Sequence, residues 1–364
     1  MKAVLFRRHG GPEVLETADV PEPSLEPGRI VVRVRACSIN HLDLWIRQGI
    51  PAYRIRLPHI SGCDVAGVVE RVGDGVTGVR AGDRVVLAPG ISCGACSACR
   101  SGDDNLCASY AIRGAGPGTS SAGTGAGPGT SSAGTGAGIA GGYAELVSAA
   151  AGEAIPLPPG VSFEEAAAFS LVFLTAWHML VGRAKLAAGE AVLIHAAGSG
   201  IGHAAIQIAK RLQAVVYATV GSDDKIARAQ ALGADAVINY RRESFEERIR
   251  AATGGRGVDV VFEHIGPETW EASLRVLAKG GRLVTCGASS GPTVSLDLRY
   301  VFSRQLTILG SMMGTRAELH EVTRLIAARV LRPVVDTVFP LSQAREAQER
   351  MARRELFGKL ILVP

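Results

Sequence analysis

The chain has little that would direct it to a nucleic acid or a membrane surface. Its 364 residues carry a formal net charge of only +5, and no run of basic residues is interleaved with aromatic ones. Nucleic acids and anionic lipids are bound by concentrated positive charge, which this sequence lacks. We therefore expect neither a nucleic acid nor a membrane as partner.

The sequence also lacks an apolar run long enough to span a bilayer. The one long uncharged run of mainly apolar residues, 166–182, falls short of the roughly 20 residues that a spanning helix needs, and it contains His178. The apolar run within residues 1–16 is too short for a signal peptide. These features predict a buried helix at 166–182 and a soluble, cytoplasmic protein.

Cysteine is scarce, and its spacing is informative. Seven cysteines without a secretory signal do not indicate a disulfide framework. Four of them follow a C-x2-C-x2-C-x7-C pattern: Cys93, Cys96, Cys99 and Cys107. Four thiolates can surround a tetrahedral Zn²⁺ and leave no position open for substrate. The pattern predicts one structural zinc, with free thiols or a redox pair as the alternative.

Length and patterning predict two domains. With 47% apolar and 20% charged residues the chain is globular, and 364 residues are many for one core. Before residue 110, short β-type runs separated by Gly and Pro predict a mostly antiparallel domain. From 189 to about 290, strands alternate with helices, which is typical of a doubly wound parallel sheet. We expect domains at 1–155 and 156–304, and a C-terminal segment, 305–364, that closes the sheet and returns to the first domain.

Residues 114–138 do not fit either domain. GAGPGTSSAGT occupies 114–124, recurs unchanged at 125–135, and is followed by Gly-Ala-Gly. This stretch has no charge and no large apolar side chain, so it cannot offset the entropy of ordering. We predict a flexible insert that carries no chemistry.

A strand, a small-residue turn, a helix and a second strand follow one another over 191–220. Small residues let the backbone approach a pyrophosphate, and the helix N-terminus offers unpaired N–H groups. In a G-x-G-x-x-G frame that ends at Gly202, the first two glycines are replaced by Ala197 and Ser199. We predict a dinucleotide-binding turn, with a plain glycine-rich turn as the alternative. Its residues are Gly198, Ser199, Gly200, Ile201 and Gly202.

Taken together, these motifs resemble the medium-chain dehydrogenase/reductase superfamily, which includes zinc alcohol dehydrogenases and quinone reductases. The resemblance covers nearly the whole chain outside the insert. It is carried by the four-cysteine lobe, by the turn at 196–202, and by four further segments: 62–73, 82–85, 232–240 and 357–359. It implies an α/β protein in which a mostly-β GroES-like domain is joined to a Rossmann dinucleotide-binding domain.

The resemblance also locates the catalytic zinc of the alcohol dehydrogenases, which is held by a Cys, a His-Glu pair and a second Cys. In this chain those positions are taken by Asn40, by Cys63 and Asp64, and by Leu171. A catalytic zinc needs about three protein ligands and an open position. Cys63 and Asp64 alone do not supply them. A shifted metal site that also uses His41, His59 or Cys37 is the alternative.

A site without a Lewis-acid metal favours reduction of a carbon–carbon double bond conjugated to a carbonyl. Hydride adds to the β-carbon, and the oxygen needs only hydrogen-bond donors. We expect Asn40 to offer an amide donor, Tyr53 to act as donor or proton source, and Asp43 to orient its neighbours. The alternatives are a turn-forming Asn40 and a Tyr53 that only lines the rim of the cleft.

For the cofactor we predict NADPH over NADH. The strand that ends at Val220 carries no carboxylate to repel a 2′-phosphate, and Ser222 or Asp223 is expected to cap the next helix. The resemblance implies 2′-phosphate binding by Lys225 and Tyr240, with Ser222 nearby. It implies that eight further residues line the nicotinamide and pyrophosphate: Thr175, Ile265, Gly266, Gly287, Ala288, Gly310, Phe357 and Lys359.

The predicted function is an NADPH-dependent reductase of a quinone or an α,β-unsaturated carbonyl. One alternative is a zinc alcohol dehydrogenase with unconventional ligands, and the other is a nucleotide-binding protein with little turnover. By resemblance we expect a homodimer, with a tetramer as the alternative, formed by pairing of the strand at 306–310.

Overall fold

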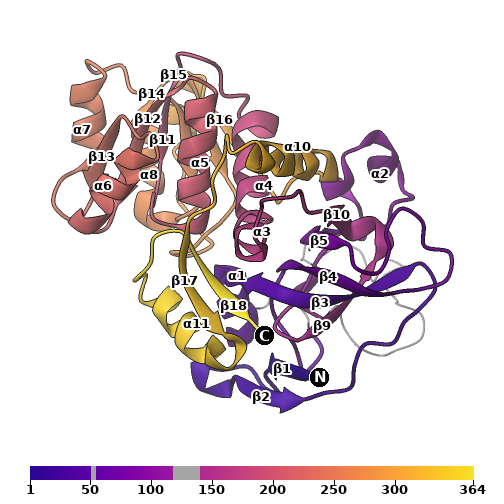
Figure 1. Cartoon of the computed structure of the whole chain (residues 1–364). Coiled ribbons are helices and arrows are strands. Elements are labelled where there is room, and N and C mark those ends of the chain that lie inside the picture. Colours follow the sequence, from indigo (N-terminus) through magenta and orange to yellow (C-terminus); the bar gives the residue numbers. More distant parts are fainter. Residues whose placement is uncertain (51–54, 118–139) are drawn as a thin grey trace. The chain divides into compact units, whose positions relative to one another are not determined.

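The structure is a computed structural model that describes residues 1–50, 55–117 and 140–364 (Figure 1). The chain forms two compact units, one of Met1–Leu171 with Thr315–Pro364 and one of Val172–Gly314. The first boundary thus follows helix α3 (Phe163–Phe169), whereas the predicted boundary preceded it. The C-terminal segment divides after residue 314, because its first strand belongs to the second unit.

The first unit is built on a seven-stranded, mostly antiparallel sheet (Figure 1). The strand order is β10–β5–β4–β3–β18–β17, and β9 also pairs with β3. Apolar side chains such as Val32 and Val34 point into the core, while Arg33 and Arg35 point outward, so β3 shows the alternation of a half-buried strand. The bounds are β3 Arg29–Ser38, β4 Asp64–Val72, β5 Arg84–Leu87, β9 Leu146–Ala150, β10 Ala154–Pro156, β17 Val335–Pro340 and β18 Lys359–Val363.

Smaller elements complete this unit. The described part of the chain adds a two-stranded sheet of β1 (Lys2–Leu5) and β2 (Glu16–Asp19), and a three-stranded sheet of β6 (Gly90–Ile91), β7 (Ala111–Ile112) and β8 (Gly116–Pro117). Its other helices are α1 His41–Gln48, α2 Ser97–Ser101, α10 Arg316–Ala327 and α11 Ala344–Ala352. The short β-type runs predicted before residue 110 form strands of this unit, among them β1, β3, β4 and β5. Strand β17 was not predicted.

One strand pairing brings the end of the chain to its beginning. Strand β18 pairs antiparallel with β3, with Ile361 opposite Ser38 and Leu362 opposite Cys37. Just beyond this ladder, the Ile39 N–H donates to the Leu360 carbonyl at 3.0 Å. Lys359, the first residue of β18, is thereby set beside the start of α1.

The second unit is a six-stranded parallel sheet in the order β13–β12–β11–β14–β15–β16. Helices connect the strands, as expected for right-handed βαβ units, and the strand order reverses between β11 and β14. The predicted doubly wound fold is confirmed. The strands are β11 Ala191–Ile194, β12 Val215–Val220, β13 Ala236–Asn239, β14 Val258–Glu263, β15 Leu277–Thr285 and β16 Thr307–Gly310. The helices are α4 Val172–Trp177, α5 Gly200–Arg211, α6 Ile226–Ala231, α7 Phe245–Ala252, α8 Pro267–Arg275 and α9 Leu298–Ser303.

The predicted insert begins too early in the sequence. Gly114 has a positive φ of 65° and its carbonyl oxygen lies 2.8 Å from His59 Nε2. Ala115 is buried, and β8 pairs with β7. Residues 114–117 are therefore part of the first unit, and residues 118–138 of the predicted insert lie outside the described residues.

The apolar stretch predicted as a buried helix is helical from Phe163 to Arg183. Ser162 accepts the Glu165 N–H at 3.1 Å and Glu165 accepts the Ser162 N–H at 2.9 Å, so the two residues form a capping box at the start of the helix. The whole segment is long and apolar enough to cross a membrane by length and composition, but 67% of its most apolar window is buried within the protein. Such burial is typical of a core helix.

Candidate active site

The four-cysteine lobe gathers its thiols around one point. The Sγ atoms of Cys93, Cys96, Cys99 and Cys107 all lie within 4.8 Å of one another. Cys99 Sγ is 3.5 Å from Cys96 Sγ and 3.9 Å from Cys93 Sγ. Tetrahedral Zn–S bonds of about 2.3 Å place sulfurs about 3.8 Å apart, so the donor set fits a zinc ion. Backbone N–H groups at Ala95 and Cys96 lower the pKa of Cys93 to about 6.

A second polar cluster lies in the interior of the first unit around Asp64. Asp64 Oδ1 accepts the Ser170 hydroxyl at 2.5 Å and the Leu171 N–H at 2.7 Å. Asp64 Oδ2 accepts the Ser38 hydroxyl at 2.6 Å and the Asn40 amide at 2.8 Å, and the Lys359 ammonium lies 3.4 Å away. The carboxylate is fully buried, and it is stabilised by these donors and by a buried cation.

The orientation of the Asn40 amide follows from its neighbours. Lys359 has only donors, so the atom that faces its ammonium at 2.6 Å must be the Asn40 oxygen. The Asn40 nitrogen then donates to Asp64 Oδ2 and, at 3.3 Å, to Cys63 Sγ. Both amide N–H groups have acceptors within the unit, which argues against the predicted role of Asn40 as a donor to substrate.

Asp43 holds the first turn of α1. Its carboxylate accepts the Asn40 N–H at 2.8 Å, the Gly62 N–H at 3.0 Å and the Tyr143 hydroxyl at 3.1 Å. Burial raises its pKa to about 6, against the opposing effect of these donors and of Lys359. The contacts are consistent with the predicted orienting role.

The alternative of a shifted catalytic metal does not match the side-chain positions. Among the described residues, only the four-cysteine lobe brings together three or more potential metal ligands. His59 lies against the Gly114 carbonyl instead. Burial raises the pKa of Cys63 well above its ordinary value. Asn40, Cys63, Asp64 and Leu171 do lie together, but they offer one thiol and one carboxylate that is already paired with Lys359.

In the second unit the predicted cofactor residues gather at the carboxyl edge of the parallel sheet, where nucleotides bind in such folds. Gly266 and Gly287 lie in adjacent loops after β14 and β15, and a Cβ at Gly266 would lie 3.5 Å from Ala288 Cα. Gly310 ends β16 and Thr175 lies on α4. The turns after β11 and β12 and the start of the β13 loop supply Gly198, Ser199, Gly200, Ile201, Gly202, Ser222, Lys225 and Tyr240.

The turn after β11 has the tight geometry that its small residues predict. A Cβ at Gly202 would lie 2.2 Å from the Ala196 carbonyl oxygen, so only glycine fits there. Ser199 caps α5 by accepting the Gly202 N–H at 2.9 Å. The Ser199 side chain caps one of the first N–H groups of α5, and the N–H groups at a helix N-terminus suit a phosphate.

The acidic residue nearest the end of β12 is already neutralised. Asp223 accepts the Asn239 amide at 2.6 Å and pairs with Arg242 at 2.6 Å. Ser222 precedes a 3-10 turn at Asp223–Lys225, as predicted for a capping position. Tyr240 is half-exposed next to Gly221.

Three predicted site residues are placed differently or not described. Tyr53 lies outside the described residues. Phe357 and Lys359 belong to the first unit and are each 1% exposed. The Lys359 ammonium donates to Ile39 O and Asn40 Oδ1 and faces Asp64, so all three of its hydrogens have acceptors. These contacts argue against its predicted contact with the cofactor.

Sequence reasoning missed the partner of Asp64 and a buried histidine network in the second unit. The available signal was Lys359, the single lysine in the apolar run at the end of the chain, because a buried ammonium requires a carboxylate partner. His195, directly after β11, carried no comparable signal.

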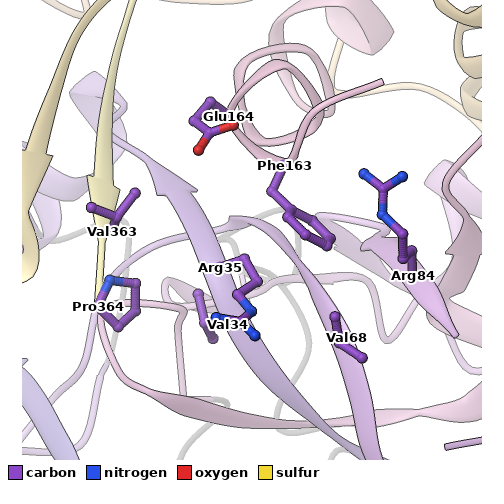
Figure 2. A pocket seen from close by; sticks show the side chains of 8 residues that line it. All are labelled: Val34, Arg35, Val68, Arg84, Phe163, Glu164, Val363 and Pro364. Carbon is purple, nitrogen blue, oxygen red and sulfur yellow. The ribbon is translucent and has the colours of Figure 1, made fainter. Parts of the chain in front are cut away.

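The first unit also has a surface cavity of about 540 Å³ (Figure 2). None of the predicted site residues lines it. Arg84 stacks on Phe163 at 4.6 Å and donates to the Val161 carbonyl. The walls are formed by Val34, Arg35, Val68, Arg84, Phe163, Glu164, Val363 and Pro364.

Known proteins resemble this chain along its whole length. A family model described as an alcohol dehydrogenase GroES-like domain matches residues 26–159, and one described as a zinc-binding dehydrogenase matches 200–328. A quinone oxidoreductase of Salmonella typhimurium is 33% identical, with 99% of this chain and 98% of that protein covered.

Solved structures give the same family. The structure of a protein described as an NAD-dependent alcohol dehydrogenase is 43% identical, with a TM-score of 0.91 and full coverage of both chains. A cobalt- and zinc-bound thermostable alcohol dehydrogenase from Pyrobaculum aerophilum is 32% identical, with a TM-score of 0.86 and coverage of 100% and 99%. The chain therefore belongs to the medium-chain dehydrogenase/reductase superfamily and is an oxidoreductase.

Proposed function

We propose that the chain is an NADPH-dependent reductase that delivers hydride to a quinone or an α,β-unsaturated carbonyl without a catalytic metal. The quinone oxidoreductases among its relatives support this assignment. The four-cysteine lobe would hold one structural zinc, because its thiols have the spacing of a tetrahedral site.

The observation that carries the proposal is the contact of Lys359 with Asn40 and Asp64. In the family's alcohol dehydrogenases the corresponding positions of Asn40, Cys63, Asp64 and Leu171 hold the catalytic zinc. Here an ammonium lies 2.6 Å from Asn40 Oδ1 and 3.4 Å from Asp64 Oδ2. The carboxylate is thus balanced by a cation of the chain itself.

Conjugate reduction suits such a site. A bound nicotinamide supplies the hydride, and negative charge develops on the carbonyl oxygen, which hydrogen-bond donors stabilise. Asn40 has no N–H left for that oxygen, so we assign the donor role to Tyr53 alone. Asn40 and Asp43 instead fix the start of α1. Tyr53→Phe is the variant that tests this assignment, and it should lower kcat more than it raises KM for the acceptor.

The preference for NADPH rests on the end of β12. Asp223, the carboxylate nearest the end of β12, already has partners in Arg242 and Asn239 and is therefore less available for ribose hydroxyls. Lys225 and Tyr240 are the proposed contacts of the 2′-phosphate. Lys225→Ala should raise KM for NADPH about tenfold, the cost of one charge-assisted contact, and leave KM for NADH unchanged.

An NAD-dependent alcohol dehydrogenase is the second candidate. The 43% identical structure, which belongs to a protein described in those words, favours it. This candidate requires an alkoxide to be stabilised during alcohol oxidation, and the Asp64 cluster offers too few metal ligands for that task.

Steady-state kinetics distinguish the two. The rates of NADPH and NADH oxidation would be measured with 1,4-naphthoquinone, an enone and a simple aldehyde. The proposal predicts turnover of the quinone or enone with NADPH and little reduction of the aldehyde. Reduction of the aldehyde with NADH as the dominant activity would support the second candidate. Tight dinucleotide binding without turnover of any acceptor would indicate a binding protein.

We also propose a homodimer through β16, the edge strand of the second unit's sheet. Leu298 and Phe302, one turn apart on the preceding helix α9, are 68% and 70% exposed. Such exposed apolar groups are typical of an interface. Light scattering should give a dimer for the wild type and a monomer for Phe302→Glu. Val215→Asp, which changes an exposed apolar residue at the start of β12, is the control and should stay dimeric.

A further inference from the structure

A buried hydrogen-bond network lies where the strand order of the second unit reverses. His195 directly follows β11, Glu263 ends the neighbouring β14, and Thr219 lies on β12. Ser273 reaches the same place from α8. Each of these four residues is at most 1% exposed. The proposed function leaves this network without a role.

The direction of each hydrogen bond can be deduced by starting from Glu263, because its carboxylate can only accept. Glu263 Oε2 accepts the hydroxyls of Thr269 at 2.8 Å and Ser273 at 3.1 Å. Because Ser273 has one hydrogen and gives it to the carboxylate, its oxygen accepts from His195 Nε2 at 2.9 Å. The proton of the neutral imidazole is therefore on Nε2.

The other side of the ring follows from this tautomer. His195 Nδ1 is an acceptor, so Thr219 donates its hydroxyl hydrogen to it at 3.3 Å. The Thr219 oxygen in turn accepts the Ala196 N–H at 3.1 Å. Every bond from Glu263 to Ala196 thus has a single consistent direction.

The two ends of the network lie on the two loops that flank the strand reversal. Ala196 begins the turn at 196–202 with a positive φ of 49°, a conformation that is unfavourable for a residue other than glycine. At the other end, Glu263 Oε1 accepts the N–H groups of Ile265 and Gly266 in the loop after β14. His195 also holds that loop through its carbonyl, which lies 3.1 Å from His264 Nε2.

In parallel α/β sheets the nucleotide binds in the crevice between these two loops. We propose that His195 is a positioning residue that holds the turn at 196–202 and the loop at 264–266 in register for a nicotinamide dinucleotide. The inference rests on the proposed function and deepens it. The imidazole is buried and acts through Ala196 on one side and Ile265 and Gly266 on the other.

Two substitutions at Thr219 separate the hydrogen bond from the volume of the side chain. Thr219→Val keeps the shape but leaves the Ala196 N–H and His195 Nδ1 without a partner. Thr219→Ser keeps the hydroxyl. Fluorescence titration would give the dissociation constants for NADPH and NADH, and steady-state kinetics would give KM for dinucleotide and for quinone.

We expect Thr219→Val to raise the dissociation constant and KM of the dinucleotide about tenfold and to leave KM for the quinone unchanged. Thr219→Ser should stay within about twofold of the wild type. Trp270→Phe, on α8 but outside the network, is the control for stability and should lower the melting temperature without weakening dinucleotide binding.

The outcomes separate the inference from the function on which it rests. If the wild type binds dinucleotide and Thr219→Val binds it equally well, the positioning role is wrong and the proposed function stands. If Trp270→Phe weakens binding as much as Thr219→Val, the effect is one of general stability, and the inference is again wrong. If the wild type binds neither dinucleotide, both are overturned.

Discussion

Lys359 and Asn40 are 319 residues apart in the chain, yet the Lys359 ammonium donates to Asn40 Oδ1 at 2.6 Å. The pairing of β18 with β3 brings them together. This contact fixes the orientation of the Asn40 amide and thereby turns its N–H groups toward Asp64 and Cys63. The same ammonium balances the buried charge of Asp64.

Removing that ammonium should be costly. Lys359→Met leaves Asp64 ionised, buried and without its cation, so we expect a loss of about 3–5 kcal/mol in the free energy of unfolding. Combining it with Asp64→Asn removes the uncompensated charge and lets the Asn40 amide rotate. The double variant should therefore be more stable than Lys359→Met alone.

Urea unfolding measures these differences, and the chain offers a matched control. Lys210 pairs with Asp235 at 2.8 Å, but their side chains are 34% and 43% exposed. Lys210→Met should cost no more than about 1 kcal/mol. A loss for Lys359→Met no larger than that for Lys210→Met would contradict the assigned role of Lys359.

The network around His195 should make stability depend on pH. Burial lowers the pKa of His195 to about 4, from about 6.5 in an unfolded chain. Between these values the unfolded state binds more protons, so the free energy of unfolding falls as the pH falls from 6.5 to 4. The limiting slope is about 1.4 kcal/mol per pH unit.

His195→Gln isolates this contribution from other groups. Glu263 and His264 face His195, and Asp43 in the first unit, with a pKa of about 6, gives a slope of opposite sign. These groups remain in both proteins. Urea unfolding between pH 4.5 and 7 should show a shallower slope for the variant, although its stability at pH 7 is lower. Equal slopes would show that His195 is not buried in its neutral form.

Two deletions in the region of the repeat at 114–135 test which of its residues the folded first unit needs. Removing one copy, 125–135, leaves Gly114–Pro117 and hence β8 in place. Activity and melting temperature should stay nearly unchanged. Deleting 114–138 also removes β8 and the carbonyl that contacts His59, so the melting temperature should fall. Differential scanning calorimetry would give the melting temperature of both deletion variants. A large fall in melting temperature on removing the single copy would show that the repeat contributes to the fold.

Local patterns predicted the elements that carry the fold. The alternation along β3 and the small-residue turn before α5 each have one structural solution, and both were predicted from local sequence. Strand β17 was missed because its residues are half-exposed and lack a clear period. The first four residues of the repeat are ordered by contacts with β7 and His59, which composition does not reveal.

The site was predicted less completely, for a physical reason. Asn40, Cys63, Asp64 and Leu171 were correctly expected near one another, but which donor meets which acceptor depends on contacts distant in sequence. Lys359 was assigned to the cofactor by resemblance, and its contacts with Ile39 and Asn40, at the other end of the chain, leave no signal in the local sequence. A hydrogen-bond network of this kind is set by strand pairing and cannot be inferred from spacing.

The most direct test of the metal-free assignment is to count zinc and measure turnover in the same preparation. Zinc per chain would be determined by mass spectrometry, and NADPH oxidation with 1,4-naphthoquinone and with an aldehyde would be followed before and after a strong chelator. The account predicts one zinc per chain and quinone reduction that persists after chelation while the protein stays folded. Two zinc ions per chain, together with aldehyde reduction that chelation abolishes, would contradict it.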